Sequence, residues 1–471
     1  MVRNLMRRIL VLSVLCIVGF CIAILPTPSG VNPKAYPIFG IFIVIVLGFL
    51  AKPYPMSVLS LLGMFVAIAS GLFTINEGFS CFNEPVIWLI VFASIAAQAF
   101  IKTNLGHRVA CFFIKKMGHS SIGLAYGLVV NEMFFASIIP ANTARAVCIT
   151  VPLAVSMSTS LGSSPQNGTE KRLGSYLNFC GMQANNFSSA LFLTAVGSNP
   201  IVQKMMFEMG IQVTWLEWFI ISCVPCIACL LIIPLIMYKL VPPELKKIPE
   251  ASDIAQKQLD EMPKITKQEI MTMLIFAGML FFWIIGSFFS IHTALVALGG
   301  LCALLIIGVL DIDDVTGAKD VWNIAIWLAI LNFFAGRLTQ YGLIQHYSEI
   351  LNSLLAGYSW GGALLIVAII YYFARYFIPG NVMHACAMFP AFSQLIISCG
   401  VPAKLGCMLL ALITAFCGYV APYGSTAGPI VLNTGYIEQR SWWKIGFTSG
   451  ALYLFIWFIL GGIWWKVLGY W

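Results

Sequence analysis

The sequence predicts an all-α integral membrane protein built from two related halves, each with a broken hydrophobic segment. Hydrophobic residues make up 60% of the 471 residues and charged residues 9%, whereas a soluble domain carries about 25% charged residues. The motif IPAN at residues 139–142 recurs as IPGN at residues 378–381, a shift of 239 residues (381 minus 142) that also takes Arg145 to His384. We interpret this recurrence as an internal repeat.

The hydropathy divides the chain into four units. Since a span needs roughly 20 mostly apolar residues, we expect about eleven transmembrane helices plus two re-entrant hairpins. The expected units are an N-terminal helix (residues 1–35), a first repeat (36–240), a hydrophilic cytoplasmic linker (241–269) and a second repeat (270–471). The hairpins are expected at residues 121–161 and 361–399, and partly unwound spans at 174–210 and 405–436.

The topology follows from counting spans and from the basic residues. An odd number of expected spans separates the two hairpins, so the hairpins enter from opposite faces and the repeats are inverted. Most of the 26 Lys and Arg residues then fall on the cytoplasmic side, as the positive-inside rule requires. We expect a cytoplasmic N-terminus, an external C-terminus and, without a transit peptide, a bacterial plasma (inner) membrane. The net charge of +8 does not predict a nucleic-acid partner, because it lies in short loops.

The broken segments are the expected substrate site. Unwound backbone is tolerated at membrane depth only beside protein or a water-filled cavity, and paired breaks in inverted repeats indicate a transporter's binding site. Helix N-termini at the breaks suit an anion. The alternative is that Pro and Asn only kink and cap structural hairpins. The expected substrate-binding residues are Asn142, Thr143, Ser198, Asn199, Asn381, Gly424, Ser425 and Thr426. The expected tip and unwound-helix residues are Pro140, Ala141, Gly197, Pro200, Pro379, Gly380 and Pro422.

Arg145 and His384 each follow a tip asparagine by about one helical turn. Ionisable residues inside a membrane are costly and by default functional. The alternatives are a snorkelling arginine and a satisfied buried histidine. Arg375 corresponds to Ala136 under the repeat and receives less weight. We expect no Asp or Glu near either tip, which disfavours a carboxylate proton relay or a site for an organic cation.

The sequence offers little support for metal or enzyme chemistry. Cys223, Cys226 and Cys229 have a spacing found among metal ligands, but Pro225 and the apolar surroundings favour simple packing. We expect no metal and no cofactor. The five histidines are scattered, and no HExxH or GxSxG motif occurs, so an intramembrane enzyme is disfavoured.

At these residues the chain resembles the divalent anion:sodium symporter (DASS) family. SIIPANTARA at residues 137–146 is similar to the SNTARA hairpin tip of its exchanger branch, which includes 2-oxoglutarate/malate translocators and citrate:succinate antiporters. YGSTAGPIVLNTGYI at residues 423–437 resembles the YGTGPAP…GYI stretch, and WWK follows at residues 442–444. The resemblance implies a homodimer with a static scaffold domain and a mobile transport domain that works as an elevator.

The resemblance also implies roles for the tips. Family tips bind substrate carboxylates through Asn and Thr, a role that carries over to Asn142, Thr143 and Asn381. Ala141 replaces a serine of the family pattern, and Gly380 and Val382 flank the second Asn. These replacements remove hydroxyl groups expected around Na⁺.

We therefore expect sodium-independent antiport of di- or tricarboxylates, leaving 2-oxoglutarate, malate, succinate, citrate and tartrate open. Arg145 and His384 would supply fixed positive charge in place of sodium ions. Because fixed charge cannot be released, an empty carrier would return only at high cost. Replacing both residues with neutral ones should then relax the need for a counter-substrate. The alternative is a Na⁺-coupled uptake symporter.

Overall fold

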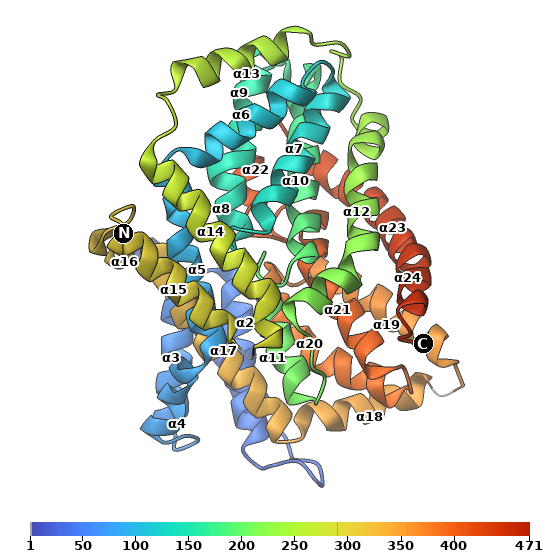
Figure 1. Cartoon of the computed structure of the whole chain (residues 1–471). Helices are drawn as coiled ribbons and strands as arrows, with labels where there is room; N and C mark the ends of the chain where they lie inside the picture. Colours follow the sequence, from blue (N-terminus) through green and yellow to red (C-terminus); the bar gives the residue numbers. More distant parts are fainter. Residues whose placement is uncertain (1, 290, 356) are drawn as a thin grey trace.

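The computed structural model describes residues 2–289, 291–355 and 357–471 as an assembly of helices, with an isolated antiparallel bridge between Ser120 and Lys247 (Figure 1). The helices up to the linker are α1 (Val2–Ala23), α2 (Ala35–Ala51), α3 (Met56–Ala69), α4 (Ile75–Phe79), α5 (Pro85–Lys102), α6 (Leu105–Met117), α7 (Ser121–Ala136), α8 (Asn142–Arg145), α9 (Val151–Ser160), α10 (Gly174–Leu191), α11 (Ser198–Glu208) and α12 (Trp215–Leu240). The linker forms α13 (Glu250–Glu261).

The same order of elements returns after the linker. The helices are α14 (Lys267–Ile285), α15 (Thr293–Ile306), α16 (Ile312–Thr316), α17 (Lys319–Gln340), α18 (Leu343–Leu355), α19 (Trp360–Phe373), α20 (Asn381–Ser398), α21 (Ala403–Phe416), α22 (Gly428–Asn433), α23 (Gln439–Ile456) and α24 (Gly462–Val467). A π-helical segment, 146–150, follows α8, and short 3₁₀ segments, 374–376 and 417–420, follow α19 and α21.

Local sequence signals set several helix starts. The Thr266 hydroxyl accepts from the N–H of Glu269, whose carboxylate accepts in return from the N–H of Thr266 at the start of α14. This capping box satisfies two donors that have no partner inside the helix. Thr214 and Ser120 cap α12 and α7 with their hydroxyls. Pro85 begins α5, where a missing N–H costs nothing.

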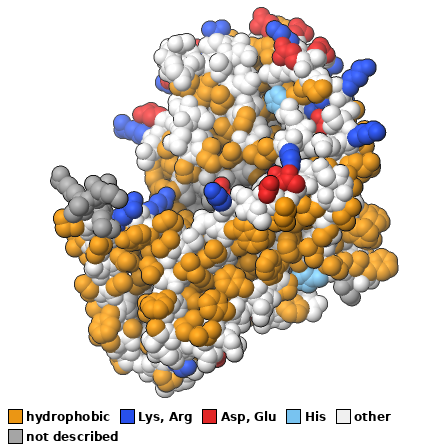
Figure 2. All heavy atoms as spheres, turned by 90° about the vertical axis from the view of Figure 1, so that its left-hand side faces the viewer, with side chains coloured by type: hydrophobic (Ala, Val, Ile, Leu, Met, Phe, Trp, Pro, Cys, Tyr) orange, Lys and Arg blue, Asp and Glu red, His pale blue; other side chains and the backbone are white. Residues whose placement is uncertain are grey.

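The number of full spans differs from the sequence-based expectation. Among the described residues, seven helices are long and apolar enough to cross a membrane, or up to eight if the bent pair α18–α19 counts as one. The apolar helices α2, α3, α7 and α15 are shorter, at 17 residues or fewer. The expected eleven spans are therefore not confirmed. The membrane character is clear, and in Figure 2 hydrophobic side chains cover much of the face shown.

The helices pack into two groups. The first group contains α2, α3, α5, α14, α15 and α17, in which α5 packs on α15 and α17. The second, the hairpin group, contains α7–α12 and α18–α24, in which α10 packs on α7, α12 and α21. The groups meet where α17 contacts α18 and α20, where α5 contacts α11 and where α14 contacts α12. In Figure 1, α6, α7 and α9 lie at the upper end and α18–α20 at the lower end, so the two hairpins come from opposite ends of the molecule.

The linker is attached to the first hairpin. Helix α13 packs on α6 and α9 (Figure 1). Gln258 donates to the Ser156 hydroxyl, and Ser252 donates to the Lys115 carbonyl. Where α14 begins, the Arg108 guanidinium on α6 lies 3.2 Å from the buried Glu269 carboxylate. The linker therefore holds the hairpin group to the start of the second half.

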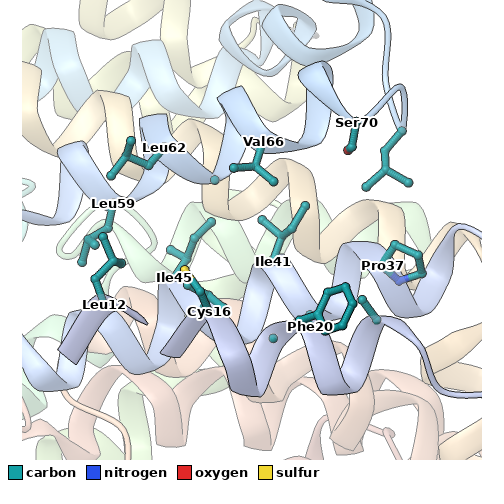
Figure 3. Close-up of a pocket in the computed structure, with 16 residues that line it drawn as sticks. Leu12, Cys16, Phe20, Pro37, Ile41, Ile45, Leu59, Leu62, Val66 and Ser70 are labelled. Carbon is teal, nitrogen blue, oxygen red and sulfur yellow. The ribbon is translucent and has the colours of Figure 1, made fainter. Parts of the chain in front are cut away.

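A cavity of about 670 Å³ lies between α1, α2 and α3 (Figure 3). Its wall is almost entirely hydrocarbon, with Leu12 and Phe20 from α1 facing Ile41 of α2 and Val66 of α3. It offers no charged donor to an anion, so the site must be sought at the helix breaks.

Candidate functional site

The first hairpin breaks between α7 and α8. Residues 137–141, which include Pro140 and Ala141, separate the two helices, and α8 begins at the predicted residue Asn142. The side chain of Asn142 is buried, and its backbone carbonyl accepts a hydrogen bond of 3.0 Å from Asn185 Nδ2 on α10. The Thr143 hydroxyl contacts that of Thr426. This contact brings the first tip to the unwound span of the second half.

The second hairpin breaks between the 3₁₀ turn after α19 and α20. Gly380 has a φ of 72°, a backbone conformation that glycine adopts at little cost, and Pro379 precedes it. The N–H of Gly380 donates to the Tyr423 carbonyl at 3.1 Å. Asn381, the first residue of α20, is buried and donates from Nδ2 to the Ala415 carbonyl at 3.2 Å. The second tip is thus held against α21 and its unwound end.

The two interrupted helices carry the remaining predicted residues. Between α10 and α11, Asn199 Nδ2 donates to the carbonyls of Ser189 and Phe192 at 2.8 and 2.9 Å. These two hydrogen bonds therefore connect α11 to the end of α10 across the break at residues 192–197. The break contains Gly197 and lies before Pro200. The predicted residue Ser198 is buried there, within its own span.

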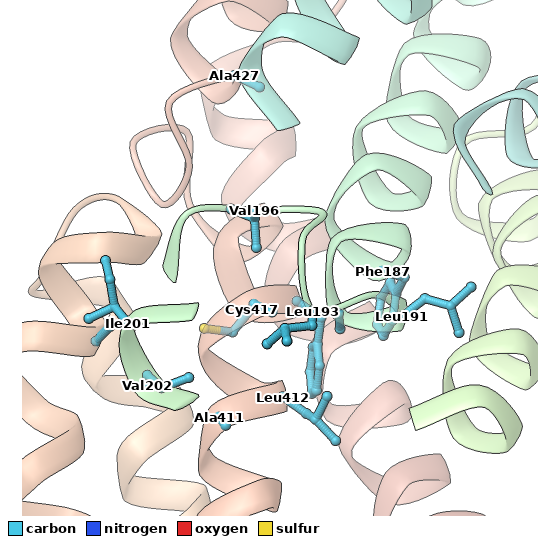
Figure 4. Packing of buried hydrophobic residues seen from close by; sticks show 14 of the residues in the cluster. Phe187, Leu191, Leu193, Val196, Ile201, Val202, Ala411, Leu412, Cys417 and Ala427 are labelled. Atoms are coloured by element: carbon cyan, nitrogen blue, oxygen red, sulfur yellow. The ribbon is translucent and has the colours of Figure 1, made fainter. Parts of the chain in front are cut away.

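In the second half, residues 421–427 separate the α21 segment from α22. This stretch contains the predicted residues Pro422, Gly424, Ser425 and Thr426, of which Ser425 is buried and Thr426 exposed. Beneath the breaks, Phe187 of α10 stacks on Phe416 of α21 with ring centroids 5.0 Å apart. Figure 4 shows this apolar packing around Leu193 and Cys417.

Three polar side chains surround Gly418. A methyl group placed there would lie 2.4 Å from Asn186 Oδ1, 2.8 Å from Asn381 Oδ1 and 3.0 Å from Ser425 Cβ. Real Cβ atoms essentially never approach other heavy atoms as closely as the first two of these distances, so position 418 must lack a side chain for α10, the second tip and the second unwound span to meet in this arrangement. Asn186 was not among the predicted site residues.

Arg145 is fully buried and forms an ion pair. Its Nε lies 3.1 Å from Glu132 Oε2 on α7, and Glu132 is also fully buried. Arg145 Nη1 donates to the carbonyls of Ile139 and Ala195, both at 2.7 Å. The expectation that no acidic residue lies near either tip is therefore wrong, because the turn at 137–141 folds Glu132 back onto α8. The charge of Arg145 is balanced inside the protein.

His384 is also fully buried. Its Nε2 lies 3.1 Å from the Tyr371 carbonyl, and its Nδ1 lies 3.4 Å from the Thr414 hydroxyl. A carbonyl accepts and a hydroxyl donates or accepts, so a neutral imidazole satisfies both contacts. The contacts at His384 require no positive charge.

Arg375 is the buried cation that received little weight from sequence. Its side chain is fully buried, and the residue is the middle one of the 3₁₀ turn after α19. It donates to the Gly380 carbonyl at 2.6 Å, to Asn381 Oδ1 at 2.7 Å, to the Thr414 carbonyl at 3.0 Å and to Cys417 Sγ at 3.2 Å. No acidic side chain in the described ranges pairs with it.

Oxygen atoms without hydrogen-bond donors cluster at the same breaks. They belong to Asn185, Asn186, Ser198, Asn199 and Ser425. Within the described residues, no group of three or more His, Cys, Asp or Glu side chains is placed to hold a metal ion. Any ion at the breaks would thus meet amide, hydroxyl and carbonyl oxygens, which are ligands that hard cations such as Na⁺ accept.

Comparison with known proteins shows extended similarity. Residues 5–471 match the family model described as the sodium:sulfate symporter transmembrane region. The chain is 38% identical to the putative malate transporter YflS of Bacillus subtilis, covering 96% of this chain and 95% of that one. It is 34% identical to dicarboxylate transporter 1, chloroplastic, of Spinacia oleracea, covering 96% and 80%.

Two further proteins extend the comparison. The L-tartrate/succinate antiporter of Shigella flexneri is 28% identical over 95% of this chain and 96% of its own. Among solved structures, the YdaH transporter of Alcanivorax borkumensis superposes with a TM-score of 0.57 at 12% identity, over 99% and 98% of the two chains. At that identity the second likeness concerns the fold alone.

Proposed function

Because the chain belongs to the sodium:sulfate symporter family of membrane transporters, we propose that it exchanges one dicarboxylate for another across the membrane without sodium. The transported anions named for its relatives support this class: malate, dicarboxylates generally, and tartrate with succinate. The chain is a transporter and not an enzyme. We propose both the choice of a dicarboxylate as the anion and exchange as the mode of transport.

The observation that carries the proposal is the unbalanced fixed charge at the second tip. Arg145 and Glu132 cancel, the contacts of His384 require no positive charge, and Arg375 has no acidic partner among the described residues. The site therefore keeps a positive charge with no bound cation. Moving an unbalanced charge through a membrane is expensive, so the empty carrier returns slowly. An anion on the return journey removes that cost, and transport becomes exchange.

The tips would bind the two ends of the anion. Asn142 and Thr143 are proposed to contact one carboxylate, and Asn381 with Ser425 and Thr426 the other. The two helix groups would slide against each other in an elevator movement, and the protein would act as a homodimer with its N-terminus in the cytoplasm. The division of the described helices into two groups, each with its own internal packing, supports such a movement.

The test is uptake of labelled malate into liposomes that contain the purified protein. Vesicles are loaded with malate or left empty, and the outside medium contains Na⁺ or choline. Exchange predicts uptake only into loaded vesicles and equal rates in both media. Uptake into empty vesicles that depends on Na⁺ would overturn the proposal.

A Na⁺-coupled symporter is the second candidate, and one observation favours it. The unpaired oxygens of Asn185, Asn186 and Ser425 gather at the helix breaks and would suit Na⁺. The same liposome experiment decides between the candidates, because only the symporter loses uptake when choline replaces Na⁺.

A further inference from the structure

The buried charges of the described residues are paired, with one exception. The fully or nearly fully buried side chains among the described Asp, Glu, Lys, Arg and His residues are Glu132, Arg145, Glu269, Arg375 and His384. Glu132 pairs with Arg145, and Glu269 pairs with Arg108. Arg375 has only neutral partners. An unpaired cation inside a membrane protein is costly and usually marks a functional site, whose counter-charge comes from elsewhere.

The contacts of Arg375 fix the orientation of the Asn381 amide. A guanidinium has donors and no acceptor, so the amide atom 2.7 Å from Arg375 Nη2 must be Oδ1. The Ala415 carbonyl only accepts, so the atom 3.2 Å from it must be Nδ2. Both constraints agree. The second Nδ2 hydrogen remains for a further acceptor, while Oδ1 is occupied by a cation and is poorly suited to bind another.

The first half has no arginine that orients its tip asparagine. The position equivalent to Arg375 is Ala136, and in the described part of the chain the Asn142 Oδ1 accepts a long hydrogen bond, 3.5 Å, from the Thr143 hydroxyl and none from a charged group. The buried charges nearby, Glu132 and Arg145, sum to zero. The first tip is therefore electrically neutral, and the second carries one positive charge behind its asparagine.

We propose that Arg375 is a positioning and specificity-determining residue: it turns the Asn381 amide N–H toward one carboxylate of the substrate and requires that carboxylate to be ionised. The neutral tip at Asn142 and Thr143 then accepts a hydrogen-bonding group that need not be charged. This inference rests on the proposed function and refines its substrate class. The site takes an anion with one obligatory carboxylate and a second polar end, which a carboxamide can replace.

The first arm of the test uses wild-type protein and three probes of equal length: succinate, its monoamide succinamate, and the neutral succinamide. Binding is measured as the ligand-induced rise in melting temperature of the purified protein over a concentration series. We expect succinate to bind best, succinamate about tenfold more weakly, as for loss of one charged hydrogen bond, and succinamide not at all. Succinamate as inert as succinamide would overturn the proposal.

The second arm uses R375K and R375Q, with R337Q as the matched control. Arg337 stacks on Phe73 and Phe333 away from the tips. R375K keeps the charge but cannot donate to both Gly380 and Asn381 in the planar arrangement, so its affinity for succinate should fall about tenfold. R375Q should lose about 100-fold and no longer distinguish succinamate from succinamide. R337Q should bind as wild type does.

The outcomes separate this inference from the proposed function. If R375Q folds and binds succinate with wild-type affinity, the role of Arg375 is wrong while exchange can still stand. If R375Q does not fold, R375K and the three probes on wild type still give the answer. If wild type binds no dicarboxylate and shows no exchange in liposomes, the proposed function itself fails.

Discussion

Glu132 and Tyr371 occupy equivalent places in the two halves. Glu132 Oε2 lies 3.1 Å from Arg145 Nε, and the Tyr371 carbonyl oxygen lies 3.1 Å from His384 Nε2. The shift that relates the two tips takes Glu132 to Tyr371 and Arg145 to His384. One half therefore has an ion pair where the other has a histidine bound to a neutral carbonyl.

Removal of Arg145 alone should strongly destabilise the protein. R145M leaves the Glu132 carboxylate buried without its cation, which costs about 3–5 kcal/mol. In E132Q/R145M the amide replaces the charge and keeps partners in Thr150 and Asn185, so most of the stability should return. Thermal unfolding of the two purified variants beside wild type checks this. Equal melting temperatures for R145M and wild type would contradict the ion-pair assignment.

The triple variant E132Q/R145M/H384Q tests which cation enforces exchange. It removes both basic residues that the sequence singled out but leaves the net charge of the tips unchanged, because Glu132 is neutralised too. We expect it to need malate inside the vesicles, as wild type does. R375Q, which removes the unbalanced charge, should allow some uptake into empty vesicles. The reverse result would return the charge-compensating role to Arg145 and His384.

Gly418→Ala should abolish transport without unfolding the protein. The added methyl would displace the amide oxygens of Asn186 and Asn381, which would lie 2.4 and 2.8 Å from it. Gly278→Ala on α14 is the control, since a methyl group there meets nothing within 4 Å. Uptake rates in liposomes and melting temperatures should be compared for both. Normal transport by the Gly418 variant would show that these side chains do not need to converge.

The outer edge of the contact between helix groups offers a way to arrest movement. Lys204 on α11 lies 2.8 Å from the Glu84 carboxylate, just before α5, beside a cavity of about 610 Å³. A short thiol-specific cross-linker should join E84C to K204C and stop exchange, and a reductant-cleavable linker should allow recovery. The two single variants treated in the same way serve as controls. Undiminished exchange by the cross-linked protein would exclude sliding at this edge.

Much of the fold was accessible from sequence because hydropathy and Pro-Asn breaks are local signals. Helix α8 begins at Asn142 and α20 at Asn381, the residues that the repeated motif singled out. The position of Glu132 was not predicted, although an acidic residue in an apolar stretch was visible. Nine residues separate it from Asn142, the last five of them in an irregular turn, and periodicity cannot be followed through such a turn.

Arg375 was missed for a different reason. The repeat comparison favours residues that recur, and Arg375 corresponds to Ala136. The chemistry of the second tip depends on Arg375, a residue that the first half lacks. Asn186 and Gly418 were missed because their importance comes from the meeting of α10 with α21, which the sequence of either helix alone does not specify.

The spacing of the buried charges along the chain bears on how the protein is made. The counter-ion of Arg145 lies 13 residues earlier, on the same hairpin. Both residues of the ion pair are therefore present as soon as this hairpin has been synthesised. Arg375 needs Thr414 and Cys417, which are 39 and 42 residues later. The second hairpin would therefore settle in the bilayer only after α21 has been synthesised, and a chain truncated before α21 should leave it exposed to the membrane's quality-control proteases.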